Sequence, residues 1–245
     1  MPEPPLNAAP VAAEGISGAE KLSVDSAHQA YKQRDFERAR ALYEALAEKH
    51  PESWQLHYNL GNTYFKLQKI GKAVLHYERA RRMEPRDYEL RSNLNYVQGV
   101  IEYKVEDKRN WYLIQWLRLA GWLNFEEAFS LALVLYAFGA GLLAWKWFSR
   151  REGKIFRLIP AVLIFFSLSL APAATKYLEA RVFREAVVIA PQVEVRYGPS
   201  SADKVAFRLV DGLKVQVEEE RGDWFLVRLV NGESGWCEAK DLERI

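Results

Sequence analysis

Residues 54–85 read "WQLHYNLGNTYFKLQKIGKAVLHYERARRMEP", and this stretch matches the one before it at a fixed spacing. Identical residues recur 34 positions apart in three pairs: Ala39 and Ala73, Tyr43 and Tyr77, and Pro51 and Pro85. Small Gly61 and Ala73 suit positions where two antiparallel helices touch. Pro85 ends a helix, because proline cannot continue the hydrogen-bond ladder. The sequence therefore predicts helical repeats.

The second copy resembles the tetratricopeptide repeat family closely. The matching signature residues are Leu60, Gly61, Tyr64, Ala73, Tyr77, Ala80 and Pro85. A third segment has Leu94 in register but then loses the pattern, which predicts a capping helix at the end of the stack. We therefore expect two repeats and a cap over residues 24–102, preceded by a disordered tail over residues 1–23.

The resemblance implies that the first helix of each repeat lines a concave, partner-binding face. By register, this face presents a mixture of aromatic and amide side chains that suits an extended or helical peptide. The candidate peptide-binding residues are His28, Tyr31, Gln55, Tyr58, Asn62, Phe65 and Tyr96. The lysine-rich clamp of some relatives is absent, because Val24 and Glu89 occupy positions where it needs cations. The alternative is that these side chains are solvated or packed against the cap.

Two apolar runs follow, over residues 128–148 and 158–175. A hydrocarbon core about 30 Å thick needs about 20 apolar residues in a helix, so the runs predict a two-helix transmembrane hairpin. The region 103–127 is predicted to be a linker with a Trp-rich interfacial helix, and 176–184 a second linker. The alternative is a hairpin buried in a globular core, but neither flanking domain is large enough to cover it.

The stretch between the two runs, 149–157, is a basic loop. Lys and Arg in short loops are retained on the cytoplasmic side. The proposed determinants of topology are Lys146, Arg150, Arg151, Lys154 and Arg157. We therefore expect a bacterial inner-membrane protein with both soluble domains in the periplasm.

The first residues, "MPEPPLNAAPVAAEGISG", lack the basic and apolar regions of a signal peptide. We interpret the chain as a mature or trimmed form. The competing interpretation is a cytoplasmic adaptor with the hairpin inverted.

From residue 185 to 245, short β-branched runs alternate with turn signals such as Asp211-Gly212 and Asn231-Gly232. Five short strands predict a small all-β barrel. The ordered landmarks resemble the bacterial SH3 domain: Val195-Arg196, Gly198-Pro199-Ser200, Gly212, Trp224, Val227 and Gly235-Trp236. Tyr197, Trp224 and Trp236 are candidates for an aromatic binding surface, although both tryptophans also suit a place in the core or rim.

The totals favour neither nucleic-acid binding nor catalysis. The chain has 34 basic and 32 acidic side chains, so its net charge does not indicate nucleic-acid binding. Its single cysteine, Cys237, is expected to be a small buried side chain. No catalytic motif is present. The four histidines, for which structural roles are expected, fit no common metal motif: His28, His50, His57 and His76. We therefore expect a non-enzymatic protein without cofactor or metal.

The order of parts resembles the BatE-type proteins of the bacterial aerotolerance operon. The expected fold class is a multidomain membrane protein with an all-α repeat, a transmembrane hairpin and an all-β barrel. The resemblance implies a scaffold for envelope integrity or stress tolerance, with von Willebrand A-domain membrane proteins and a MoxR-type AAA+ ATPase as partners. The alternative is a peptidoglycan-binding accessory that recruits a hydrolase.

Overall fold

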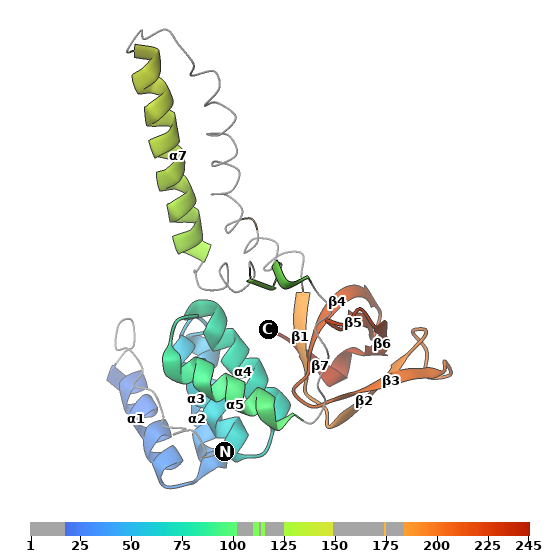
Figure 1. The fold of residues 1–245 in the computed structure, drawn as a ribbon. Coiled ribbons are helices and arrows are strands. Elements are labelled where there is room, and N and C mark those ends of the chain that lie inside the picture. Colours follow the sequence, from blue (N-terminus) through green and yellow to red (C-terminus); the bar gives the residue numbers. More distant parts are fainter. Residues whose placement is uncertain (1–17, 102–109, 113, 116–124, 149–173, 175–183) are drawn as a thin grey trace. The chain divides into compact units, whose positions relative to one another are not determined.

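The computed structural model describes residues 18–101, 110–112, 114–115, 125–148, 174 and 184–245. The chain forms two compact units, Met1–Arg109 with Phe183–Ile245, and Asn110–Val182. In the first unit, helices are followed by an antiparallel sheet (Figure 1). The repeats and the carboxy-terminal domain therefore belong to one unit, although more than 70 residues separate them in the chain.

The helical part consists of α1 (Gly18–Lys32), α2 (Phe36–Lys49), α3 (Trp54–Lys66), α4 (Ile70–Met83) and α5 (Tyr88–Val100). Helix α1 begins earlier than the predicted boundary at residue 24. The turns after α1 and α3 each contain a residue with positive φ, Arg34 at 62° and Gln68 at 60°. These two residues lie at equivalent positions of the 34-residue repeat, which confirms the predicted helical repeats.

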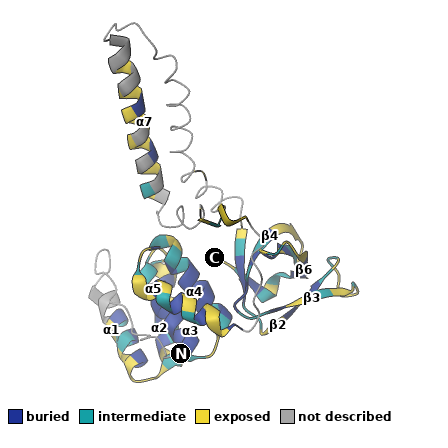
Figure 2. Cartoon of the chain, in the orientation of Figure 1, coloured by how far each residue is buried: buried dark blue, intermediate teal, exposed yellow. Residues whose placement is uncertain are grey.

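Close packing joins the two helices of the second repeat. A Cβ atom on Gly61 would lie 2.6 Å from two ring atoms of Tyr77, so only glycine allows α3 to approach this ring. Tyr77 and Ala73 are fully buried on α4. Figure 2 shows that buried residues concentrate along α3 and α4. The second repeat is therefore the centre of the helical core.

The carboxy-terminal domain is a seven-stranded antiparallel sheet with the order β3-β2-β6-β5-β4-β1-β7. Its strands are β1 (Arg184–Val188), β2 (Gln192–Arg196), β3 (Val205–Val210), β4 (Lys214–Arg221), β5 (Trp224–Arg228), β6 (Ser234–Glu238) and β7 (Leu242–Arg244). A short 3₁₀ helix, η2 (Ala239–Asp241), precedes β7. The prediction of five strands was too low, because the turn at Gly232 divides the last predicted run into β5 and β6, and β7 was not anticipated. Cys237 is fully buried, as expected, and burial raises the pKa of its thiol to about 12.

Helix α7 (Phe125–Phe148) contains the first predicted membrane span, 128–148. It exposes large apolar side chains, namely Phe129, Leu133, Val134, Tyr136 and Phe138. Among the residues that the structure describes, no helix is both long enough and apolar enough to cross a bilayer. The first span, 128–148, stays a prediction. The second predicted span, 158–175, lies outside the described residues except for position 174.

Replacing Gly61 with alanine tests the packing of α3 on α4. We expect G61A to destabilise the repeats by about 1–3 kcal/mol, because its methyl group would overlap the Tyr77 ring. Hydrogen exchange of α3 and α4 amides in the full chain measures this change. The matched control is G99A in α5, where a Cβ atom meets nothing within 4 Å and alanine should stabilise the helix by about 0.5–1 kcal/mol. Equal protection in both variants would contradict the account.

Candidate functional site

The sheet packs directly against the second repeat through a small apolar contact. Gly212, in the turn between β3 and β4, has a φ of 87°, which favours glycine. A Cβ atom there would lie 2.7 Å from Ile101 Cδ1 and 3.2 Å from Ile70 Cγ2. On α4, a Cβ atom on Gly71 would lie 2.3 Å from the carbonyl oxygen of Val188. Gly71 therefore lets the helix meet the backbone of the sheet, and Gly212 leaves room for the side chains of Ile70 and Ile101.

The first turn of α4 receives a carboxylate from the sheet. Lys69 occupies the N-cap position and makes no side-chain capping bond. The Asp211 carboxyl lies at this end of the helix, close to Gly71, and its buried Oδ1 atom has no hydrogen-bond partner. Burial raises the pKa of Asp211, because it outweighs the opposing effect of the nearby backbone N–H groups. The turn between β3 and β4 thus places a buried carboxyl group at the start of α4.

A buried carboxylate links the helix to the sheet further along α4. Glu78 is 3% exposed, and Arg81 holds its Oε2 atom at 2.6 Å. Lys214 of β4 lies 3.8 Å from Oε1, and it also pairs with Glu185 of β1 at 3.2 Å. Burial alone would raise the pKa of Glu78, but Lys214 and Arg81 outweigh it and hold the pKa below its ordinary value. The ionised form of Glu78 therefore depends on a cation of the sheet.

The edge strand β7 lies against a basic face of α4, which we define by Lys72, Arg79 and Arg82. Glu243 pairs with Lys72 and with Arg79, the latter at 3.1 Å. Arg79 also donates to the carbonyl oxygen of Arg244 at 2.7 Å, and Arg82 to that of Ile245 at 2.7 Å. Unpaired edge strands can recruit other chains, and natural proteins cover them. The basic face of α4 thus closes this edge of the sheet.

A pocket of about 680 Å³ lies beside this contact. Its lining includes Glu44 and Glu48 of α2, Leu60 and Tyr64 of α3, and the basic face of α4. Glu243 and Ile245 of the SH3 domain also line it. We call this cavity the α4 pocket. Its lining thus combines acidic, basic and apolar side chains.

Two histidines line the α4 pocket and form a buried pair. His57 Nε2 lies 3.1 Å from the Pro51 carbonyl oxygen, which can only accept, so this nitrogen carries the proton. His57 Nδ1 is then the acceptor for His76 Nδ1–H, at 3.1 Å. The His76 ring also stacks on the Tyr64 ring, with 5.3 Å between the two ring centroids. Burial lowers the pKa of both histidines, and His57, Arg79 and Lys72 lower that of His76 further.

Comparison with known families assigns both parts of the first unit. Residues 24–94 match the tetratricopeptide repeat family, and residues 191–243 match the bacterial SH3 domain. The chain contains a tetratricopeptide repeat region and a bacterial SH3 domain. Comparison with curated proteins gives no match. The two domain resemblances inferred from the sequence are confirmed, whereas the resemblance to BatE-type proteins stays a prediction.

The predicted concave-face residues of the repeats lie in two environments. Tyr31, Tyr58, Asn62 and Phe65 are buried. The amide of Asn93 on α5 donates to the Tyr58 hydroxyl at 2.9 Å and to Asn62 Oδ1 at 3.1 Å, and the Tyr77 hydroxyl donates to the same Asn62 oxygen. The half-buried members are His28, Gln55 and Tyr96. Peptide binding at this face stays a prediction, and Tyr58 and Asn62 also hold the cap onto the repeats.

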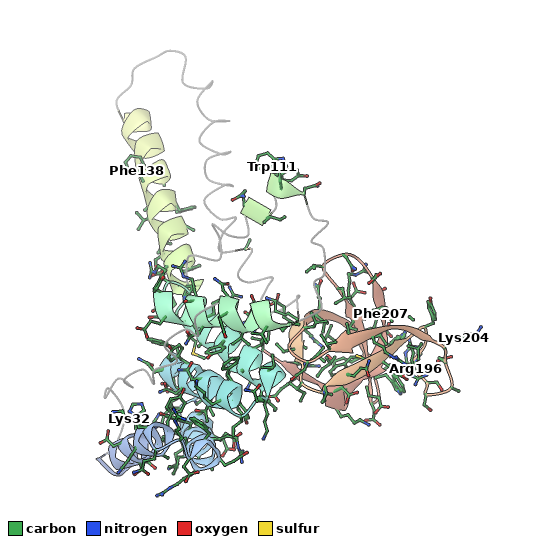
Figure 3. The ribbon with its side chains drawn as sticks, turned by 60° about the horizontal axis from the view of Figure 1, so that its bottom comes forward. Lys32, Trp111, Phe138, Arg196, Lys204 and Phe207 are labelled. Carbon is green, nitrogen blue, oxygen red and sulfur yellow. The ribbon has the colours of Figure 1, made fainter. Side chains whose placement is uncertain are left out.

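The predicted aromatic surface of the SH3 domain is divided by burial. Tyr197 is 74% exposed, whereas Trp236 is buried with the Arg221 guanidinium 4.9 Å from its ring centroid. Trp224 is half-buried and pairs with Arg221 across β4 and β5. Figure 3 shows Arg196 and Lys204 on the neighbouring β2–β3 hairpin. Tyr197 is therefore the member best placed to meet a ligand.

The basic residues proposed as topology determinants cannot be placed. Arg150, Arg151, Lys154 and Arg157 lie outside the described residues, and nothing is described of the Lys146 side chain at the end of α7. Among the described residues, no group of three or more metal-binding side chains gathers in one place.

The α4 pocket and the docking of the SH3 domain were not predicted from the sequence. One signal was present, because Lys72 and Arg79 are seven residues apart and Arg82 follows three later, which places all three on one helical face. Their acidic partner, Glu243, is more than 160 residues away and has no local signature. Sequence analysis had assigned structural roles to His57 and His76, and their mutual hydrogen bond agrees with that assignment.

Replacing Gly212 tests the docking of the SH3 domain. We expect G212A to loosen the contact, because its methyl group would meet Ile101. Gly232 is the matched control, since its φ is 92° but a Cβ atom there meets nothing within 4 Å. Both variants carry the same backbone strain, so only G212A should raise hydrogen exchange in the first turn of α4. Equal exchange in G232A would show that the strain, rather than the contact, is responsible.

The histidine pair predicts a pH dependence of repeat stability. Because folding lowers both pKa values, stability should be constant above the unfolded pKa of about 6.5 and should fall as the pH drops below it. Hydrogen exchange of α3 and α4 amides at pH 7.5 and pH 5 measures the loss. A His76→Gln variant should be less stable at pH 7.5 and should show a smaller loss on acidification. An identical pH slope in the variant would rule out the pair as its source.

Proposed function

We propose that this protein is a non-enzymatic adaptor, attached to a membrane, that presents its repeats and its SH3 domain to protein partners as one fixed unit. The two domain families suggest protein-binding or peptidoglycan-binding adaptor roles. The observation that carries the proposal is the direct docking of the SH3 domain on α4. A partner that touches both domains would gain affinity because the second contact becomes intramolecular.

Membrane attachment through the region 125–175 is supported by the two apolar runs and by the exposed apolar side chains of α7. The ends of the intervening segment give further support. Ile101 packs against Gly212, and Arg184 begins β1, so both ends leave the same compact unit. If the segment between residues 101 and 184 enters a bilayer, it must return to the same side, because both of its ends are joined to that one unit. This fits a hairpin with both domains on one side, and the basic loop 149–157 favours the periplasmic side.

The order of domains favours a BatE-type scaffold for envelope integrity or stress tolerance. On this proposal, von Willebrand A-domain membrane proteins and a MoxR-type AAA+ ATPase are the partners. Peptidoglycan binding is the second candidate, favoured by the exposure of Tyr197 on the SH3 domain. This second function predicts that the full chain sediments with purified sacculi and that Tyr197→Ala abolishes the sedimentation.

Membrane attachment and topology are tested together in bacterial cells. We expect the full chain to sediment with membranes and to resist carbonate extraction, because the apolar runs would lie in lipid. A cysteine introduced as Gly153→Cys should react with an impermeant maleimide only after the cells are opened. Cys237 is buried and should not contribute to the labelling. Recovery of the chain in the carbonate supernatant, or labelling in intact cells, would contradict the proposed arrangement.

A further inference from the structure

Helix α4 holds an extended strand by a specific set of contacts. Lys72 and Arg79 bind the Glu243 carboxylate, and Arg79 and Arg82 bind the carbonyl oxygens of the next two residues. These contacts use one acidic side chain and two backbone groups of three consecutive residues. Backbone recognition of this kind accepts any extended segment, and the carboxylate supplies the specificity.

The α4 pocket continues from this contact and offers an apolar surface. Leu60, Tyr64 and Met83 line it, while the SH3 domain reaches it only with Glu243 of β7 and with Ile245. An incoming segment could therefore approach the basic face of α4 while the SH3 domain is still docked. Glu48 of α2 also lines the pocket and would repel a carboxylate there, whereas Glu44 is already paired with Arg40. An acidic side chain would thus turn toward α4, and an apolar neighbour would enter the pocket.

We propose that the basic face of α4 and the α4 pocket form a binding site for an extended acidic segment of a partner protein, and that strand β7 occupies this site in cis. The segment would carry a carboxylate next to an apolar side chain and would displace Glu243. The inference rests on the proposed adaptor function and names the chemistry of one partner. The site lies apart from the concave face of the repeats.

The charges at this contact are suited to exchange. Lys72 is 31% exposed, Arg79 26%, Arg82 36% and Glu243 32%. Ion pairs exposed to this degree are screened by solvent and are individually weak. Strand β7 holds the site because it belongs to the same chain and so has a high effective concentration. A partner segment that also fills the pocket gains contacts that β7 does not make.

The test uses the full chain in detergent and a fluorescein-labelled peptide, Asp-Leu-Glu-Arg-Ile, which has the sequence of residues 241–245. The peptide should bind the Glu243→Gln variant roughly fivefold more tightly than the wild type by fluorescence anisotropy, because the competing carboxylate is gone. Adding Arg79→Ala should weaken this binding by roughly fivefold, as should glutamine in place of glutamate in the peptide. The matched control is Glu218→Gln, since Glu218 pairs with Arg228 within the sheet and should leave the affinity at the wild-type value.

A second measurement covers the case in which Glu243→Gln is poorly folded. Saturating peptide added to the wild-type chain should accelerate hydrogen exchange of the Glu243 and Arg244 amides, because β7 is displaced. A purely structural contact would show no acceleration. Absence of saturable binding to Glu243→Gln together with unchanged exchange in β7 would overturn the proposal. Neither readout depends on membrane attachment, so failure here is distinguishable from failure of the proposed function.

Discussion

The contact between helix α4 and the sheet determines how the two binding domains are presented. At its centre, Gly71 of α4 approaches the backbone of Val188 and Gly212 leaves room for Ile101, and ion pairs lie beside this contact. Glu78 shows the dependence most clearly, because its carboxylate is buried and its ionised form is stabilised by a lysine from the other domain. A buried carboxylate without such a partner is strongly unfavourable. Lys214 therefore couples the charge of Glu78 to the SH3 domain, while Arg81 holds the same carboxylate from within the repeat.

This contact changes the expected role of the intervening segment. The sequence suggested two recognition modules joined only through a hairpin, and membrane attachment would then have been their sole means of acting together. In the structure they belong to one unit, and helix α4 packs in the repeat core and also contacts the SH3 domain. Its inner face carries Ala73 and Tyr77 of the repeat core, and its outer face carries the cations that hold β7. Coupling between the two domains thus resides in one helix.

The sequence predicted the parts better than their assembly. The repeat was predictable because Gly61, Ala73 and Pro85 mark local packing and helix ends at a fixed period. The turns at Gly212 and Gly232 were predictable too, because an aspartate or asparagine before glycine indicates a turn between two strands. The burial of Tyr58 and Asn62 was missed because it depends on Asn93 of the cap, where the repeat pattern has already faded. The docking of β7 was missed because a surface glutamate has no periodicity that identifies a distant partner.

The arginines that hold β7 also bear on how the SH3 domain behaves when it is cut out of the chain. In the intact protein, Arg79 and Arg82 occupy carbonyl oxygens along that edge of the sheet. An excised fragment would leave the same carbonyl groups open to a neighbouring copy, while Glu243 would lose Lys72 and Arg79 and Glu185 would keep only Lys214 as its counter-ion. Self-association of such a fragment would then reflect the missing helix rather than a native dimer. Expression boundaries chosen from the SH3 domain alone would therefore create an aggregation-prone molecule.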